Sequence, residues 1–184
     1  MTEAAPAGAL LNPADEARRK LTLYLGTVGG VIVLDQITKF IAERSLRLYD
    51  PVPVLGDFFR LTYIFNRGAA FGLNLGGASR WVFMALAAVA VVVLWIMYRS
   101  TPWTDRWRLV AIASVTGGAV GNLIDRVRSS RGVVDFLDFG VGEVRWPVFN
   151  VADIAVTCGA LLLAFSLWRE EKKIEQELDD PPAV

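Results

Sequence analysis

The sequence lacks histidine altogether and has a single cysteine, Cys158, in 184 residues. The absence of histidine excludes Ser–His–Asp and Cys–His catalysis and any zinc site that depends on histidine. One cysteine excludes an internal disulfide, and its place in an apolar run indicates a small packing residue. The chain also has no net excess of positive or negative charge. The 19 basic and 19 acidic residues cancel, so the net charge does not indicate a nucleic-acid partner.

Apolar residues, by contrast, make up 54% of the chain, and the mean hydropathy is +0.42. A bilayer span needs about 20 mostly apolar residues. Four segments approach that length: 21–42, 80–98, 107–126 and 150–168. All six tryptophans lie at or near the ends of these segments or in the short connections, as is typical of residues at a membrane–water interface. We therefore predict one membrane domain, 21–168, between polar tails 1–20 and 169–184.

Short basic segments beside the spans indicate the orientation. Residues 18–20, 99–108 and 169–173 hold closely spaced lysines and arginines, and antiparallel spans would place all three on one face. The total number of cations on the two faces nearly balances, but the positive-inside bias acts through such short segments. We predict that both termini are cytoplasmic.

Polar residues at the span ends then gather at the opposite, outer face. They are Asp35, Lys39, Asn66, Arg67, Asn122, Asp125, Arg126, Asn150 and Asp153. A charged group at bilayer depth costs about 3 kcal/mol or more, so such residues face a bundle interior and mark function. Long side chains can reach the headgroups instead, but Asp125 and Asp153 are too short for this.

Two stripes of small residues lead to these aspartates at helical spacing. The stripes are Ala113, Gly117, Gly121 and Asp125 in the third span and Asp153, Thr157, Ala160 and Ala164 in the fourth. Packing of the two stripes would bring Asp125 and Asp153 together at the outer rim. Two neighbouring carboxylates share one proton, so one can activate water while the other stabilises the developing oxyanion, as in aspartic proteolysis.

Five sequence blocks, in order, carry a resemblance to a known family. They are DQITK (35–39), FNRGAAFG (65–72), GGAVGNLIDR (117–126), GVVDFLDF (132–139) and FNVADIAV (149–156). The chain resembles lipoprotein signal peptidase, also called signal peptidase II, the bacterial membrane aspartic protease. The resemblance implies that Asp125 and Asp153 form the catalytic pair.

The same resemblance implies the substrate and the setting. The substrate would be a prolipoprotein that already carries diacylglycerol, cut just before the lipidated cysteine, and globomycin-type peptides would inhibit the reaction. The protein would be a multi-pass inner-membrane enzyme in contact with membrane lipid, with its site near the periplasmic face. We expect no metal or other cofactor, no nucleic acid, and a monomer.

Further candidate residues surround the predicted pair. They are Asn66, Gly68, Asn122, Arg126, Asn150, Asp35 and Lys39. Asp35 and Lys39 have i,i+4 spacing and are favoured as a structural ion pair over a direct substrate contact. Two roles remain open for Arg126: it could bind a lipid phosphate, or it could hold the loop that follows it. Asp135 and Asp138 are interpreted as loop structure rather than as catalytic residues.

The connection between the first two spans includes FFRLTYIF (58–65), whose alternation is typical of a strand. We place a small extracytoplasmic β-cradle at about 45–68, and the resemblance adds a short interfacial helix or loop within the outer loop 127–149. The predicted fold is thus an all-α membrane protein, a four-transmembrane-helix bundle with this β-cradle.

Two other functions remain as alternatives. In a Ser/Lys membrane peptidase, Lys39 would be the base for Ser45. A small transporter or proton-relay protein would also hold acids within the membrane. The acids of this chain cluster at one rim, with no second set at mid-depth, which counts against a relay.

Overall fold

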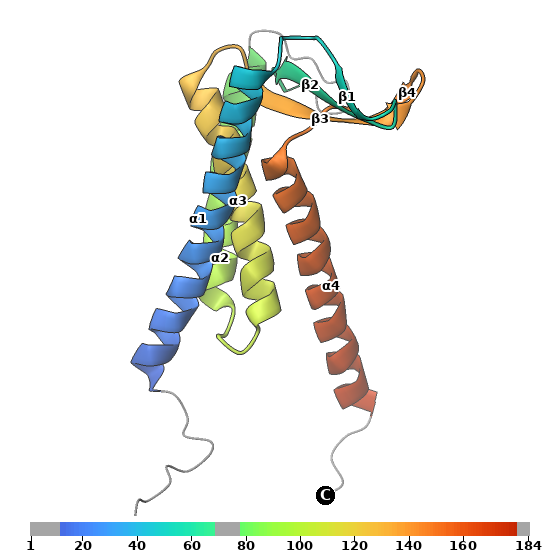
Figure 1. Ribbon diagram of the computed structural model, residues 1–184. Coiled ribbons are helices and arrows are strands. Elements are labelled where there is room, and N and C mark those ends of the chain that lie inside the picture. Colours follow the sequence, from blue (N-terminus) through green and yellow to red (C-terminus); the bar gives the residue numbers. More distant parts are fainter. Residues whose placement is uncertain (1–11, 69–77, 180–184) are drawn as a thin grey trace, which may run out of the picture.

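The computed structural model describes residues 12–68 and 78–179. Four long helices dominate it (Figure 1). They are α1 (Pro13–Ser45), α2 (Ser79–Ser100), α3 (Arg106–Arg128) and α4 (Val151–Asp179). Each is long and apolar enough to cross a membrane. The predicted four-helix membrane bundle is therefore confirmed.

The helices extend beyond the predicted spans at both ends of the chain. α1 begins at Pro13 because the Asn12 side chain accepts a hydrogen bond from the Ala14 N–H, and Asp15 and Glu16 lie in the first turn. α4 continues as far as Asp179, into the segment that was predicted to be a polar tail, where Lys172 and Glu175 form an ion pair. Residues 13–20 and 169–179 of the two predicted tails are thus helical.

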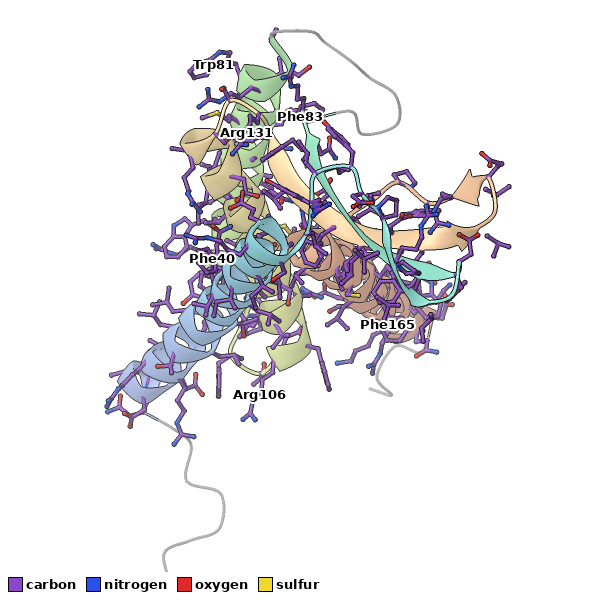
Figure 2. All side chains as sticks on the ribbon, turned by 45° about the horizontal axis from the view of Figure 1, so that its top comes forward. Phe40, Trp81, Phe83, Arg106, Arg131 and Phe165 are labelled. Carbon is purple, nitrogen blue, oxygen red and sulfur yellow. The ribbon has the colours of Figure 1, made fainter. Side chains whose placement is uncertain are left out.

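Apolar side chains cover the outside of the bundle. Phe40 on α1, Trp81 on α2 and Phe165 on α4 all lie on the outer surface, with 53%, 65% and 53% of their area exposed (Figure 2). Such large exposed apolar residues recur along α1, α2 and α4, whereas on α3 they are found near its ends, at Trp107 and Val127. In water this surface would be unfavourable, whereas in a bilayer it contacts lipid.

Helix α3 occupies the centre of the bundle and packs against the other three helices. Small residues allow this close approach. A Cβ added at Gly117 would lie 2.8 Å from the Val31 Cβ on α1, and one added at Gly118 would clash with the Ala152 carbonyl oxygen on α4. Gly159 plays the same part from the α4 side.

The predicted stripe on α3 therefore faces α1 rather than α4. The side of α3 that carries Gly117, Gly121 and Asp125 faces α1. A Cβ added at Gly121 would lie 2.6 Å from Oδ2 of Asp35, which is on α1. The neighbouring stripe, Gly118 and Asn122, faces α4. Relative to the prediction, α3 is thus rotated by one residue about its axis. This rotation determines which neighbouring helix each of its side chains contacts in the site.

A four-stranded antiparallel sheet lies across one end of the bundle and projects to one side (Figure 1). Its strands, in the order β1-β2-β3-β4, are β1 (Val52–Leu55), β2 (Phe59–Asn66), β3 (Val133–Val141) and β4 (Val144–Arg145). The first two confirm the predicted β-cradle.

The outer loop was expected to form a loop or short helix, but it supplies β3 and β4 instead. In the described stretch 129–150 there is no helix. The residues VVDFLDF are rich in branched and aromatic side chains, and their backbone pairs with β2, Asp135 opposite Ile64 and Leu137 opposite Leu61. The strand thereby brings Asp135 from the loop to the top of the bundle.

Candidate functional site

A cluster of polar side chains lies where α1, α3 and α4 meet β3. Five of its members are at most 6% exposed: Asp35, Lys39, Asp125, Asp135 and Asn150. Within the described part of the chain, no buried side-chain nitrogen or oxygen is without a hydrogen-bond partner. Such fully satisfied networks are rigid, because an unpaired polar group at this depth is costly.

Lys39 is the centre of one half of the cluster. Its Nζ lies 2.8 Å from Asp35 Oδ2, 2.8 Å from Asp125 Oδ2 and 2.9 Å from Asn122 Oδ1. Asp125 Oδ1 also accepts from Gln36 Nε2 at 3.1 Å. Both oxygens of Asp125 are therefore engaged, and its charge is balanced by a buried cation.

Asp35 connects this half to the start of α4. Its Oδ1 accepts from the Ala152 N–H at 3.0 Å, while Oδ2 faces Lys39. The N–H groups of a first helical turn favour a carboxylate acceptor. The predicted Asp35–Lys39 ion pair is present, and it also fixes the position of the α4 terminus.

Asp153 lies in that first turn and is held from two sides. Asn122 Nδ2 donates to its Oδ1 at 2.8 Å, and the Asn150 N–H donates to its Oδ2 at 3.2 Å. In return, the Asp153 N–H donates to Asn150 Oδ1 at 2.9 Å. This reciprocal arrangement is a capping box with Asn150 as the cap. Asp153 keeps part of its surface exposed.

Asp135 was missed by the sequence reasoning as a site residue. Its carboxyl group is fully buried on β3 and accepts from Asn150 Nδ2 at 2.6 Å and Asn66 Nδ2 at 2.9 Å. No ion pair joins it to a basic side chain of the described residues. Burial, and next the nearby carboxylate of Asp153, raise its pKa to about 7. Asn150 contacts both aspartates.

Asp138 lies on the same strand as Asp135 but belongs to a different cluster. It accepts from Thr62 Oγ1 at 2.6 Å, Arg60 Nε at 3.0 Å and Arg145 Nε at 2.7 Å. Burial acts to raise its pKa, but these three hydrogen bonds outweigh burial and hold the pKa below its usual range. Asp138 therefore stabilises the sheet, as expected of a structural residue.

Arg126 and Gly68 lie beside the site cluster. Arg126 Nη1 donates to the Asn122 carbonyl at 3.1 Å, and its guanidinium lies 5.5 Å from the centre of the Phe83 ring. Gly68 has a φ of +103° and donates its N–H to Asn66 Oδ1 at 2.9 Å, and an added Cβ would clash with the same Phe83 ring. Arg126 and Asn66 line a cavity of about 270 Å³.

The structure thus brings together the predicted polar residues, with Gln36 and Asp135 as additions. It links Asp125 to Lys39 and Asp153 to Asn122, and each of these carboxylates has its own set of donors. Residues 69–72 of the FNRGAAFG block lie outside the described residues. Among the described residues, no group of three or more acidic or cysteine side chains is arranged to hold a metal ion.

Comparisons with known proteins agree with this membrane architecture. A family model described as "Signal peptidase (SPase) II" matches residues 27–169. The lipoprotein signal peptidase of Cupriavidus taiwanensis is 43% identical over 82% of this chain and 85% of its own length, and that of Halothermothrix orenii is 42% identical over 77% and 92%. A solved bacterial membrane enzyme has a TM-score of 0.73 at 28% identity, covering 88% of this chain and 93% of that one.

Proposed function

The chain belongs to the signal peptidase II family and is thus a multi-pass membrane peptidase, and on this premise we propose that it removes signal peptides from prolipoproteins. We take the substrate to be a prolipoprotein whose cysteine already carries diacylglycerol, cut before that cysteine. The observation that supports this proposal most is that Asn150 contacts two carboxyl groups at one end of the bundle, those of Asp135 and Asp153.

The proposed catalytic pair is Asp153 with Asp135. Asn150 contacts both side chains, and the charge of Asp153 helps to raise the pKa of Asp135 to about 7. Burial is the largest cause of this rise in pKa, and it favours the protonated form of Asp135. Near neutral pH the pair therefore carries one proton between its two carboxyl groups, which is the state that aspartic proteolysis requires.

The sequence-based alternative pairs Asp153 with Asp125. It is supported by the cavity of about 180 Å³ that Asp125 lines. Against it, the contacts of the Asp125 side chain are with α1 and β3, where Lys39 Nζ lies 2.8 Å from its Oδ2 in a buried ion pair. Among the described residues, no donor to the Asp125 side chain, whether Lys39, Gln36 or the Val134 N–H, also contacts Asp153. Asn150, by contrast, contacts both Asp135 and Asp153. The contacts therefore favour a structural role for Asp125.

The proposed reaction follows from this division of roles. Water attacks the scissile carbonyl carbon while the Asp153 carboxylate accepts one of its protons. Protonated Asp135 donates a hydrogen bond to the carbonyl oxygen and stabilises the tetrahedral intermediate. The C–N bond then breaks and the leaving nitrogen takes up a proton, so the products are a signal peptide with a new carboxylate and a lipoprotein with a free amino group.

Substrate binding has a structural requirement. Asp135 has no exposed surface, and its two oxygens accept from Asn66 and Asn150. The substrate carbonyl must therefore displace one of these amides. Asn66 is the better candidate because Asn150 also caps α4. We place the site at the periplasmic face with both termini in the cytoplasm, and we expect a monomer that binds globomycin-type peptides at this site.

A Ser/Lys mechanism is disfavoured by the contacts of Lys39. Its ammonium group lies within 2.9 Å of acceptors on Asp35, Asp125 and Asn122. A lysine that serves as a base must present a lone pair to the serine hydroxyl, and these three acceptors take up its three N–H donors instead.

Three single substitutions test the pair: Asp135→Asn, Asp153→Asn and Asp125→Asn. Each purified protein is mixed in detergent with a diacylglyceryl-modified prolipoprotein, without added metal, and the released signal peptide is measured by mass spectrometry. Asp135→Asn and Asp153→Asn are expected to lower turnover by at least about a hundredfold while the protein remains folded. Asp125→Asn is expected to lower thermal stability and to retain turnover in the folded fraction.

The control is the helical circular dichroism of each variant, which reports the folded fraction. Full turnover by Asp135→Asn together with an inactive, folded Asp125→Asn would restore the alternative pair. Full turnover by Asp153→Asn would remove the aspartic mechanism altogether. Release of signal peptide from a prolipoprotein without diacylglycerol at the same rate would contradict the proposed substrate.

A further inference from the structure

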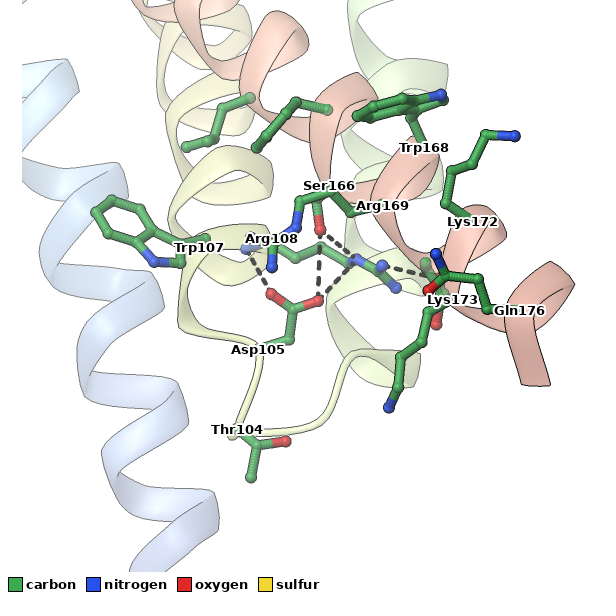
Figure 3. Close-up of a pocket in the computed structure, with 13 residues that line it drawn as sticks. Thr104, Asp105, Trp107, Arg108, Ser166, Trp168, Arg169, Lys172, Lys173 and Gln176 are labelled. Atoms are coloured by element: carbon green, nitrogen blue, oxygen red, sulfur yellow. Dashed lines mark hydrogen bonds and ion pairs between the residues drawn. The ribbon is translucent and has the colours of Figure 1, made fainter. Parts of the chain in front are cut away.

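A further cavity lies at the opposite end of the bundle from the aspartates. It has a volume of about 790 Å³ and lies between the start of α3 and the last turns of α4 (Figure 3). Both of these helices are candidate membrane spans. The cavity is therefore located where the spans leave the bilayer, on the face that we expect to be cytoplasmic.

An ion-pair network joins the two helices at this cavity. Arg108 Nε lies 3.1 Å from Asp105 Oδ2 and 3.2 Å from Ser166 Oγ, and its Nη2 lies 2.8 Å from Glu170 Oε2 (Figure 3). Arg108 thereby neutralises much of the charge of the two acids. Both carboxylates are thus paired with Arg108, although 53% of the Glu170 side chain remains exposed.

The remaining charged residues of the lining are all basic. They are Arg169, Lys172 and Lys173, so the lining holds four cations against two carboxylates. Lys172 pairs with Glu175 at 2.7 Å, but both side chains are 54% exposed. Exposed ion pairs of this kind are weak, so a stronger anion can compete for Lys172.

Aromatic and apolar side chains form the rest of the lining. Trp107 and Trp168 are 71% and 54% exposed, although each carries a large apolar ring. Leu162 and Phe165 continue the apolar surface along α4 toward the bilayer interior. Tryptophan is favoured at the level of lipid headgroups, and apolar side chains below it contact acyl chains.

We propose that this cavity binds an acidic phospholipid from the surrounding bilayer. The phosphate would be held by Arg169, Lys172 and Lys173, and an acyl chain would lie along Leu162 and Phe165. Basic pockets between spanning helices recognise anionic headgroups in this way. The excess of cations favours an acidic lipid over a zwitterionic one, and the apolar wall favours a lipid over a free phosphate ion.

The test compares lipid retention by the full-length protein and two variants. Each is purified in mixed micelles that contain equal amounts of dioleoyl-phosphatidylglycerol and dioleoyl-phosphatidylcholine, and bound lipids are counted by native mass spectrometry. The test variant is Lys172→Gln/Lys173→Gln. The matched control, Arg18→Gln/Arg19→Gln, removes two cations at the same end of the bundle but outside the cavity.

The unaltered protein and the control are expected to retain phosphatidylglycerol in preference to phosphatidylcholine. The test variant is expected to lose this preference by roughly tenfold, because each cation near a headgroup contributes to binding. Equal preference in all three proteins would overturn the proposal, as would retention of phosphatidylcholine alone. Loss of phosphatidylglycerol on addition of millimolar inorganic phosphate would show a phosphate-ion site instead. The readout does not depend on peptidase activity.

Discussion

Replacement of Lys39 by methionine tests the energetic role of the ion-pair cluster. Lys39 is 3% exposed, and its ammonium group lies 2.8 Å from carboxylate oxygens of both Asp35 and Asp125. Methionine is of similar length and removes the charge. Because two buried acids lose their counter-charge, we expect the free energy of unfolding to fall by about 3–5 kcal/mol.

The measurement is denaturant unfolding in detergent, followed by helical circular dichroism. A second variant, Lys39→Met/Asp125→Asn, removes one of the two uncompensated carboxylates and is expected to recover part of the loss. Lys172→Met, which breaks an exposed pair at the other end of the bundle, serves as the control and should leave the unfolding midpoint unchanged. A loss below about 1 kcal/mol for Lys39→Met would refute the reasoning, since an exposed pair would show the same.

Two further predictions concern helix packing and pH. Gly118→Ala is expected to lower the free energy of unfolding by about 1–3 kcal/mol, because the added Cβ would clash with the Ala152 carbonyl oxygen. Gly26→Ala, where an added Cβ has no neighbour within 4 Å, should not lower it. Thermal melts of the two variants provide the comparison. The pKa of Asp135 is about 7 when folded and 3.8 when unfolded, so the unfolded state ionises first and stability falls as pH rises from about 4 to about 7. Unfolding at several pH values should show this fall, and Asp135→Asn should reduce it.

The helices and most site residues could be predicted from the sequence because their signals are local. Hydropathy over about 20 residues identifies a span without knowledge of its partners. The placement of Asp35, Asn122 and Asn150 near one membrane face followed from the alternation of the spans. Their hydrogen bonds to one another, such as Asn150 Nδ2 to Asn122 Oδ1 at 3.1 Å, depend on how the helices are rotated.

The rotation of α3 about its own axis could not be predicted from the sequence. The stripe of Gly117, Gly121 and Asp125 was expected to face the fourth span, yet it faces α1. Both Gly117 and Gly118 permit a close approach, so small-residue spacing alone cannot distinguish the two faces of α3. A polar signal was available, because Lys39 on the first span needs a buried counter-charge and Asp125 is an acid at the same depth.

Asp135 was overlooked for a different reason. It lies in a segment between spans, where a charged residue is usually solvated, so the sequence supplied no reason to bury it. The strand pairing of β3 with β2 moves it within reach of Asn66 and Asn150, where its surface is fully covered. A polar residue in an outer loop thus becomes a site residue through sheet register, which depends on contacts distant in the sequence.

The arrangement gives the three buried acids of the site different environments although they lie close together. Asp35 and Asp125 share the Lys39 cation, whereas Asp135 has amide donors and no ion pair within the described residues. Asp35 and Asp125 are thus ion-paired, whereas burial, acting against the hydrogen bonds from its amide donors, raises the pKa of Asp135. The same helix ends can therefore hold an ion-paired cluster that fixes α1, α3 and α4, and beside it one acid that can exchange a proton with Asp153. If the first cluster serves only to position the second, neutral replacements in it should weaken folding before they abolish turnover.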